Sequence, residues 1–175
     1  MKLTVYRSFQ KAEIDIPSVP LYNSKEIPYR RYVMGNDLNN ARLRLTAGNY
    51  TCVLCKENIY YTSTRRGVAP LLQWLEEGLP LDGFSAADKV VGRAAALLYR
   101  LLGVRELYAA VISRGALEVL NQGGIAVCYD TLTDGIINRA GNGPCPMEAA
   151  TRDITDPALA PAAIRLALQK LQQAH

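Results

Sequence analysis

The chain has 175 residues, of which 49% are hydrophobic and 21% are charged. This length suffices for one domain with its own core, so neither disulfides nor a structural metal is needed. No apolar run approaches the roughly 20 residues that span a bilayer, which argues against a membrane partner. The first ten residues contain no run typical of a signal peptide, so we expect a cytoplasmic protein whose four cysteines are reduced.

Residues 1–36 are predicted to form an extended N-terminal arm, because Pro17, Pro20 and Pro28 recur too often for a helix. The arm carries six basic and three acidic residues, so it supplies +3 of the formal net charge of +4. Its tyrosines and arginines could hold single-stranded nucleic acid, but three excess charges make this partner unfavoured. Contact with the body of the protein or with a second copy in a homodimer is the preferred interpretation.

The body, residues 37–175, begins with a predicted helix that Asn36 or Asp37 caps and Gly48 ends. Two β-rich runs around residues 56–58 predict a hairpin, and a helix that ends at Gly78 follows. Residues 84–103 are apolar almost all round, which is typical of a central helix covered on most sides.

The last third of the body alternates strand, helix and strand, over residues 106–113, 115–122 and 125–131. Parallel strands need such a crossover, so this order predicts a parallel pair. A helix over "CPMEAATRDI", residues 145–154, and a terminal helix beginning near Asp156 and Pro157 complete the chain. The predicted fold class is α/β, a three-layer α/β/α sandwich around a mixed sheet.

The pair Cys52 and Cys55 has the C-x-x-C spacing of zinc and redox sites. Both residues fall in a predicted strand, where side chains three residues apart point to opposite faces. The pair is therefore interpreted as core filling, and Cys128 as a buried strand residue.

Cys145 lies in "GPCPMEAA", between two prolines and at a predicted helix start. A thiol beside the free backbone N–H groups of a helix start is favoured as a thiolate. Glu148 follows one turn later and could relay a proton, although its charge opposes thiolate formation. The alternative is purely structural, with Glu148 capping backbone donors and Cys145 packed.

Three polar stretches are further candidates for a site. Ser85 and Asp88 have the spacing of a capping box and could instead line a pocket. The loop after the hairpin combines hydroxyls with two arginines before a helix, which suits a phosphate as well as it suits a solvated turn. Its residues are Thr62, Ser63, Thr64, Arg65 and Arg66. The polar residues Asn138 and Arg139 precede the glycine-rich turn.

Three stretches carry a resemblance to a known family: "GNYTCVLCKENIYYTSTRRGVAPLL", "GFSAADKVVGRAAALLYRLLGV" and "YDTLTDGIINRAGNGPCPME". Together they make roughly residues 37–172 resemble an uncharacterised bacterial family, a domain of unknown function placed in the cytidine-deaminase-like superfamily. The resemblance implies a cytidine-deaminase-like fold for residues 37–175 and does not extend to the arm.

Zinc deaminases of that superfamily carry H-x-E at the start of one helix and P-C-x-x-C at the start of the next. Pro144 and Cys145 match the second motif, but Glu148 replaces its second cysteine. Ala86 to Asp88 is the closest register for the first motif, without a histidine and with Asp88 at the glutamate position. A catalytic zinc needs about three protein ligands, so the resemblance implies a zinc-less branch with no metal or cofactor.

The resulting hypothesis is a zinc-free protein that binds a nucleotide or related phosphorylated small molecule near Cys145. Cys145, Asp88 and Glu148 are its candidate catalytic residues. The candidate ligand-binding residues are Thr62, Ser63, Thr64, Arg65, Arg66, Ser85, Lys89, Asn138 and Arg139. Two alternatives stay open: a transferase or hydrolase that uses Cys145 as its nucleophile, and a non-catalytic interaction or regulatory protein.

Overall fold

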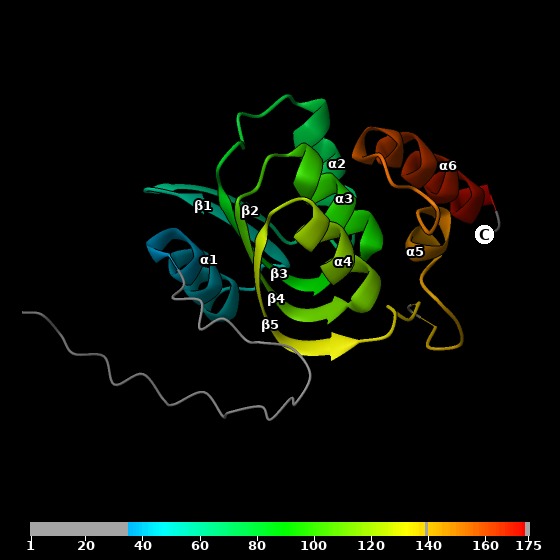
Figure 1. Ribbon diagram of the computed structural model, residues 1–175, viewed down its shortest axis with the longest axis horizontal. Helices are drawn as coiled ribbons and strands as arrows, with labels where there is room; N and C mark the ends of the chain where they lie inside the picture. Colours follow the sequence, from blue (N-terminus) through cyan, green and yellow to red (C-terminus); the bar gives the residue numbers. More distant parts are fainter. Residues whose placement is uncertain (1–34, 139, 174–175) are drawn as a thin grey trace, which may run out of the picture. The chain divides into compact units, whose positions relative to one another are not determined.

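The computed structural model describes residues 35–138 and 140–173 (Figure 1). The predicted arm, except for its last two residues, and Arg139 lie outside these ranges. The strands of the described part are β1 (Cys52–Lys56), β2 (Ile59–Ser63), β3 (Ser85–Val91), β4 (Glu106–Ser113) and β5 (Ala126–Thr133). Its helices are α1 (Asn36–Ala47), α2 (Ala69–Glu76), α3 (Arg93–Leu101), α4 (Arg114–Gln122), α5 (Pro146–Ala150), the 3-10 helix η1 (Pro157–Leu159) and α6 (Ala160–Gln173).

The five strands form one mixed sheet in the order β2-β1-β3-β4-β5. Strand β1 is antiparallel to both β2 and β3, whereas β3, β4 and β5 are mutually parallel. The predicted hairpin and the predicted parallel pair are thus confirmed. Because β2 runs in the same direction as β3, the carboxyl ends of four strands meet at one edge of the sheet.

Helices cover both faces of this sheet, an arrangement consistent with a three-layer sandwich (Figure 1). Helix α1 buries Leu38, Ala41 and Leu45 against one face, where Val53 and Cys55 also point. The other face packs against α2, α3 and α4 in the larger core. Cys52 belongs to this larger core, so the two cysteines of the C-x-x-C spacing do point to opposite faces. No described helix is long and apolar enough to cross a bilayer.

The prediction of a single helix over residues 84–103 is wrong. Ser85–Val91 is the central strand β3, and helix α3 begins only at Arg93, after Gly92. The first four residues of β3 are buried, because helices cover both of its faces. A strand buried on both faces loses its polar alternation, so its sequence resembles that of a buried helix.

Three local predictions also need correction. Helix α1 begins at Asn36 after Gly35, and no side chain caps it. Helix α5 has only five residues and ends at Ala150. Cys128 is half-buried, because in the described part β5 pairs only with β4 and forms an edge of the sheet. The predicted helix start near Asp156 matches η1, which begins at Pro157 and leads into α6. Asp156 Oδ1 accepts a hydrogen bond of 3.0 Å from the Ala158 N–H.

Candidate functional site

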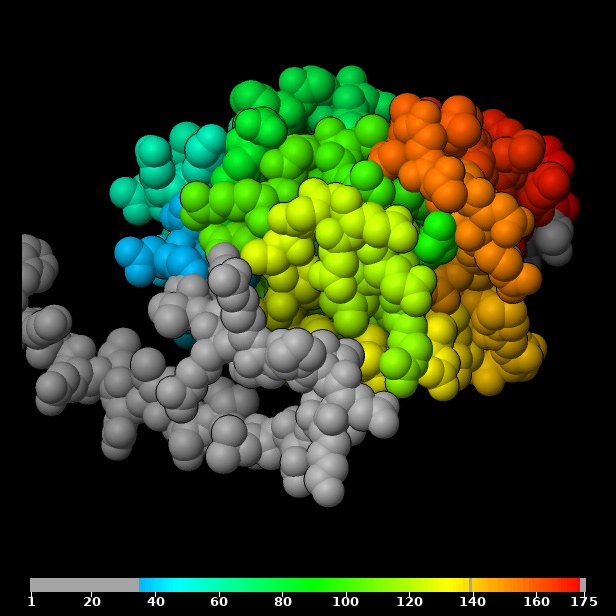
Figure 2. Space-filling view, in the orientation of Figure 1, coloured from blue at the N-terminus to red at the C-terminus, as the bar shows by residue number. Residues whose placement is uncertain are grey.

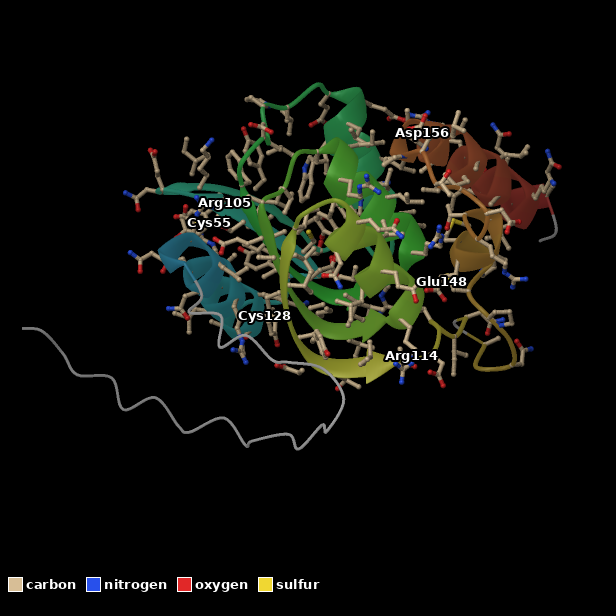
Figure 3. The ribbon with its side chains drawn as sticks, viewed as in Figure 1. Cys55, Arg105, Arg114, Cys128, Glu148 and Asp156 are labelled. Atoms are coloured by element: carbon tan, nitrogen blue, oxygen red, sulfur yellow. The ribbon has the colours of Figure 1, made fainter. Side chains whose placement is uncertain are left out.

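Several predicted site residues lie at the carboxyl edge of the sheet, where ligands of α/β proteins commonly bind. Figure 3 shows Glu148 and Arg114 at this end of the strands, and Arg105 and Cys55 at the opposite end. Ser85 begins β3 and pairs in register with Glu106, so it too lies at the opposite end. Its hydroxyl donates to the Glu106 carboxylate over 2.5 Å. The structure therefore separates Ser85 from Cys145.

Cys145 is the residue that precedes the first turn of α5, as the sequence predicts. Its backbone N–H donates to the Ile136 carbonyl over 2.7 Å, which ties α5 to the loop after β5. Cys145 as a whole is half-buried. Asn138 shapes the same loop, because its Oδ1 accepts from the Asn142 N–H and its Nδ2 donates to the Asn142 side chain.

The Glu148 carboxylate accepts hydrogen bonds from groups outside its own helix. One carboxylate oxygen accepts from the Arg93 N–H over 3.3 Å and from the Ser113 hydroxyl. The other accepts from the Ile136 N–H over 2.7 Å. These contacts join α5 to the ends of β3, β4 and β5, and no hydrogen bond within the described part links this carboxylate to the Cys145 thiol. With these hydrogen bonds, Glu148 holds α5 against the ends of the three strands.

Asp88 is buried in the middle of the sheet, so the predicted register of an H-x-E motif at a helix start is wrong. Its Oδ2 accepts from the Tyr99 hydroxyl over 2.6 Å, and its Oδ1 accepts from the Val90 N–H over 3.0 Å. The Tyr99 hydroxyl also lies 3.1 Å from the Cys52 sulfur. Burial raises the pKa of Asp88 to about 6, against the lowering effect of these hydrogen bonds.

Sequence reasoning missed this group of Cys52, Tyr99 and Asp88. One signal could have found it, because a tyrosine within an apolar helix needs a partner for its hydroxyl. Burial and the nearby Asp88 carboxylate hold the pKa of both Tyr99 and Cys52 well above their ordinary values. These groups remain neutral, and Tyr99 acts as a hydrogen-bond donor.

The predicted phosphate loop lies on the exposed surface after β2. Two of its side chains form hydrogen bonds with nearby residues. The Arg65 guanidinium donates to Gln73 over 2.7 Å, and Ser63 Oγ accepts from the Arg65 N–H over 3.0 Å. Thr51 donates to the Arg65 carbonyl over 2.5 Å. Among the predicted ligand-binding residues, Thr62, Thr64, Arg65 and Arg66 are exposed here, and Lys89 is exposed on β3. The loop geometry is that of a solvated turn.

None of the predicted site residues within residues 35–138 and 140–173 lines either of the two pockets that contain Leu101 and Gly103. A physical reason is the topology: α2, α3 and α4 all cover the same face of the sheet (Figure 1). A ligand crevice opens at a carboxyl edge where successive helices switch to opposite faces, and β3, β4 and β5 have no such switch.

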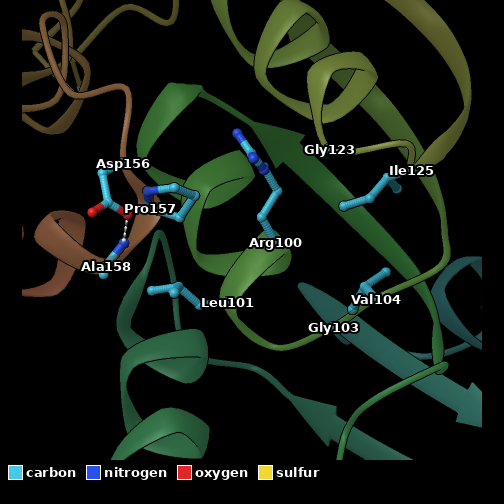
Figure 4. A pocket seen from close by; sticks show the side chains of 9 residues that line it. All are labelled: Arg100, Leu101, Gly103, Val104, Gly123, Ile125, Asp156, Pro157 and Ala158. Carbon is cyan, nitrogen blue, oxygen red and sulfur yellow. Dashed lines mark hydrogen bonds between the residues drawn. The ribbon is translucent and has the colours of Figure 1, made fainter.

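A pocket of about 390 Å³ lies at the other end of the molecule, before β4 and β5 begin. We call it the Arg100 pocket (Figure 4). Its wall consists of Arg100, Leu101, Gly103, Val104, Gly123, Ile125, Asp156, Pro157 and Ala158. In Figure 4, Arg100 rises between the segment from Asp156 to Ala158 and the segment from Gly123 to Ile125. A second pocket of about 260 Å³ shares Leu101 and Gly103 with it.

Arg100 is the polar group of this pocket that most clearly suits a ligand. It stands in the last turn of α3, and no described residue forms a hydrogen bond or ion pair with its guanidinium. Its Nε would lie 2.7 Å from a Cβ added at Gly123, so that glycine leaves room for the side chain. A guanidinium presents five N–H donors in a fork that matches carboxylates and phosphates. Sequence reasoning missed Arg100, because a basic residue in a last helical turn usually serves only the helix dipole.

The cysteines should react with an alkylating agent in the order of their accessibility. Burial raises the pKa of Cys52, of Cys55 and of half-buried Cys128. Cys145 is half-buried and lies in a short helix start at the surface. We expect alkylation at pH 7 to modify Cys145 first and Cys52 last, as followed by mass spectrometry of peptides. Faster modification of Cys52 than of Cys145 would contradict this order.

No group of three or more metal-ligating side chains of the His, Cys, Asp or Glu type occurs within residues 35–138 and 140–173. Cys145 and Glu148 alone therefore do not make a zinc site, which needs about three protein ligands.

Comparisons with known proteins agree with the fold and name no activity. Residues 40–167 match the model of a domain of unknown function, DUF1893. The crystal structure of a DUF1893 family protein from Thermotoga maritima is similar, with a TM-score of 0.67 and 24% sequence identity. The similarity covers 85% of this chain and 99% of that chain. No curated protein matches. Because the matched residues span well over half of the sequence, the chain belongs to the DUF1893 family.

Proposed function

We propose that this domain binds a small organic anion, of the nucleotide or other phosphorylated class, in the Arg100 pocket. The observation that carries the proposal is a guanidinium without a partner in the described part of the chain, standing in the wall of a cavity. The volume of about 390 Å³ falls within the roughly 300–1,000 Å³ of small-molecule sites. Of the other lining residues, Asp156 is the charged one, and its Oδ1 accepts from the Ala158 N–H. The rest are apolar or glycine, which suits the body of an organic ligand.

This location differs from the one that the sequence predicts, near Cys145. There, the backbone and hydroxyl donors that would hold an anion are already occupied by the Glu148 carboxylate. The phosphate loop after β2 uses Arg65 for an internal contact with Gln73. Arg100 is thus better placed for an external anion than either predicted region.

The test is ligand binding to the full chain, measured by thermal shift and calorimetry. The panel contains inorganic phosphate, nucleosides, their monophosphates and small carboxylates, so that phosphate and carboxylate chemistry are separated. We expect monophosphates to stabilise the protein more than nucleosides. Arg100→Gln should weaken the best ligand by about 10–100-fold, because a hydrogen-bonded charge contributes roughly 1.5–3 kcal/mol. Arg100→Lys should lose less ligand affinity, since lysine keeps the positive charge but lacks the planar set of N–H donors of a guanidinium.

Two control variants locate the site. Arg165→Gln removes an exposed arginine that pairs with Glu76 on the surface, and it should leave ligand affinity unchanged. Arg66→Gln tests the loop after β2. If Arg66→Gln abolishes binding and Arg100→Gln does not, the ligand binds at that loop and the proposal is wrong. Equal stabilisation by nucleosides and monophosphates would show that the phosphate group is not recognised, and the proposal would be wrong.

A further inference from the structure

The carboxylate of Glu148 occupies the point where three parallel strands end. It accepts hydrogen bonds from the Arg93 N–H after β3, the Ser113 hydroxyl at the end of β4 and the Ile136 N–H after β5. Two glycines let the carboxylate approach. A Cβ at Gly92 would lie 3.2 Å from one of its oxygens, and a Cβ at Gly135 would lie 3.3 Å from the other.

Arg93 contacts the segment around α5 through both its backbone and its side chain. While its backbone N–H donates to Glu148, its guanidinium donates to the Thr151 carbonyl and to the Ile154 carbonyl, each over 2.8 Å. These carbonyls lie just beyond the end of α5, where a positive charge is favourable. The first residue of α3 therefore holds the segment around α5 by its backbone and by its side chain.

The same segment continues into the wall of the Arg100 pocket. Asp156, Pro157 and Ala158 line that pocket opposite Arg100, which stands on the last turn of α3. Helix α3 thus contacts the segment at both of its ends. In Figure 2 the segment and α6 form a continuous orange-to-red surface beside the green surface of the central helices.

We infer that Glu148 acts as an internal carboxylate ligand that holds residues 146–158 against α3. The hydrogen bonds of Glu148 and Arg93 are called the latch here, and we infer that their release opens the Arg100 pocket. The latch itself stands on the contacts of Glu148 and Arg93. Its effect on ligand binding rests on the proposed function. An external carboxylate should be able to replace the Glu148 side chain, because the three donors come from the body and not from α5.

The experiment is chemical rescue of Glu148→Ala in the full chain. Loss of three hydrogen bonds to a charged group should lower the Tm by about 5–10 °C. The variant leaves the donors in place, so added acetate should raise its Tm by about 2–4 °C relative to chloride at equal ionic strength. The wild type and Glu148→Gln, whose side chain still fills the site, should show no such difference. Glu118→Ala, an exposed glutamate of α4, is the matched control and should show neither effect.

Hydrogen exchange is a second measurement, and it can be made on either of two variants. The amides of Arg93 and Ile136 should exchange faster in Glu148→Ala, and acetate should restore their protection. If Glu148→Ala fails to fold, Ser113→Ala removes one donor and should speed exchange of the amides in residues 146–158. Rescue equal in acetate and chloride, or unchanged exchange in these variants, would overturn the latch.

Ligand affinity separates this inference from the proposed function. If Glu148→Ala binds the best monophosphate as the wild type does while Arg100→Gln does not bind, the pocket is real and its control by the latch is refuted. If Arg100→Gln binds normally, the proposed function fails, and acetate rescue still decides the latch.

Discussion

Replacing Asp88 with asparagine should remove a pH dependence of about 3 kcal/mol from the stability of this protein. Asp88 is 7% exposed, and burial raises its pKa from an ordinary 3.8 to about 6. A difference of about two pKa units between the folded and unfolded states corresponds to roughly 3 kcal/mol in the free energy of unfolding. The neutral amide of asparagine does not titrate, so its contribution is constant.

The sign follows from proton binding. Between pH 4 and pH 6 the folded state holds the Asp88 proton while the unfolded state has lost it. The stabilisation that the protonated carboxyl provides is complete below pH 4 and is lost as pH rises through about 6. We therefore expect the unfolding free energy of the wild type, relative to Asp88→Asn, to fall from pH 4 to pH 7.

Urea unfolding at several pH values measures this difference directly. Asp134→Asn is the matched control, because Asp134 is an exposed carboxylate whose side chain is 94% accessible and pairs with the surface residue Arg114. Its difference curve should be nearly flat. A flat difference curve for Asp88→Asn as well would show that folding does not raise the pKa of Asp88.

The second large effect is expected at Tyr99, which is fully buried between Cys52 and Asp88. Tyr99→Leu should lower the free energy of unfolding at pH 7 by about 4 kcal/mol. About half of this loss comes from the missing hydroxyl, which leaves the buried Asp88 carboxylate without its donor. The rest comes from the cavity that the smaller side chain leaves in the core.

Tyr99→Phe separates these two contributions, since it keeps the ring and removes only the hydroxyl. It should lower the free energy of unfolding by about 2 kcal/mol at pH 7. The loss should be smaller at pH 4, where Asp88 carries a proton and no charge has to be stabilised. Tyr129→Phe, at an exposed position of β5, is the control and should change stability by less than about 0.5 kcal/mol. A loss at pH 4 as large as that at pH 7 would show that the Asp88 charge is not involved.

Elements with local signals could be predicted from the amino-acid sequence alone. Helix α1 has its apolar residues at positions 38, 41 and 45 and ends before Gly48, and the turn between β1 and β2 lies where the two β-rich runs meet. Cys145 and Pro146 mark the start of α5, because proline at a first helical position and a corner residue before it are local features. These predictions depend only on neighbours in the chain.

The conformation of the central segment and the partners of the polar side chains depend on contacts between residues far apart in the sequence. Residues 85–91 form a strand because they lie between β1 and β4, with helices over both faces, which the local pattern does not reveal. The partners of Glu148 are 12, 35 and 55 residues away in the sequence, at Ile136, Ser113 and Arg93. Asp88, Tyr99 and Cys52 likewise meet only through the pairing of β1 with β3 and the packing of α3. Arg100 became a candidate because folding places it in a cavity without a described partner, and its position in the sequence carries no sign of this.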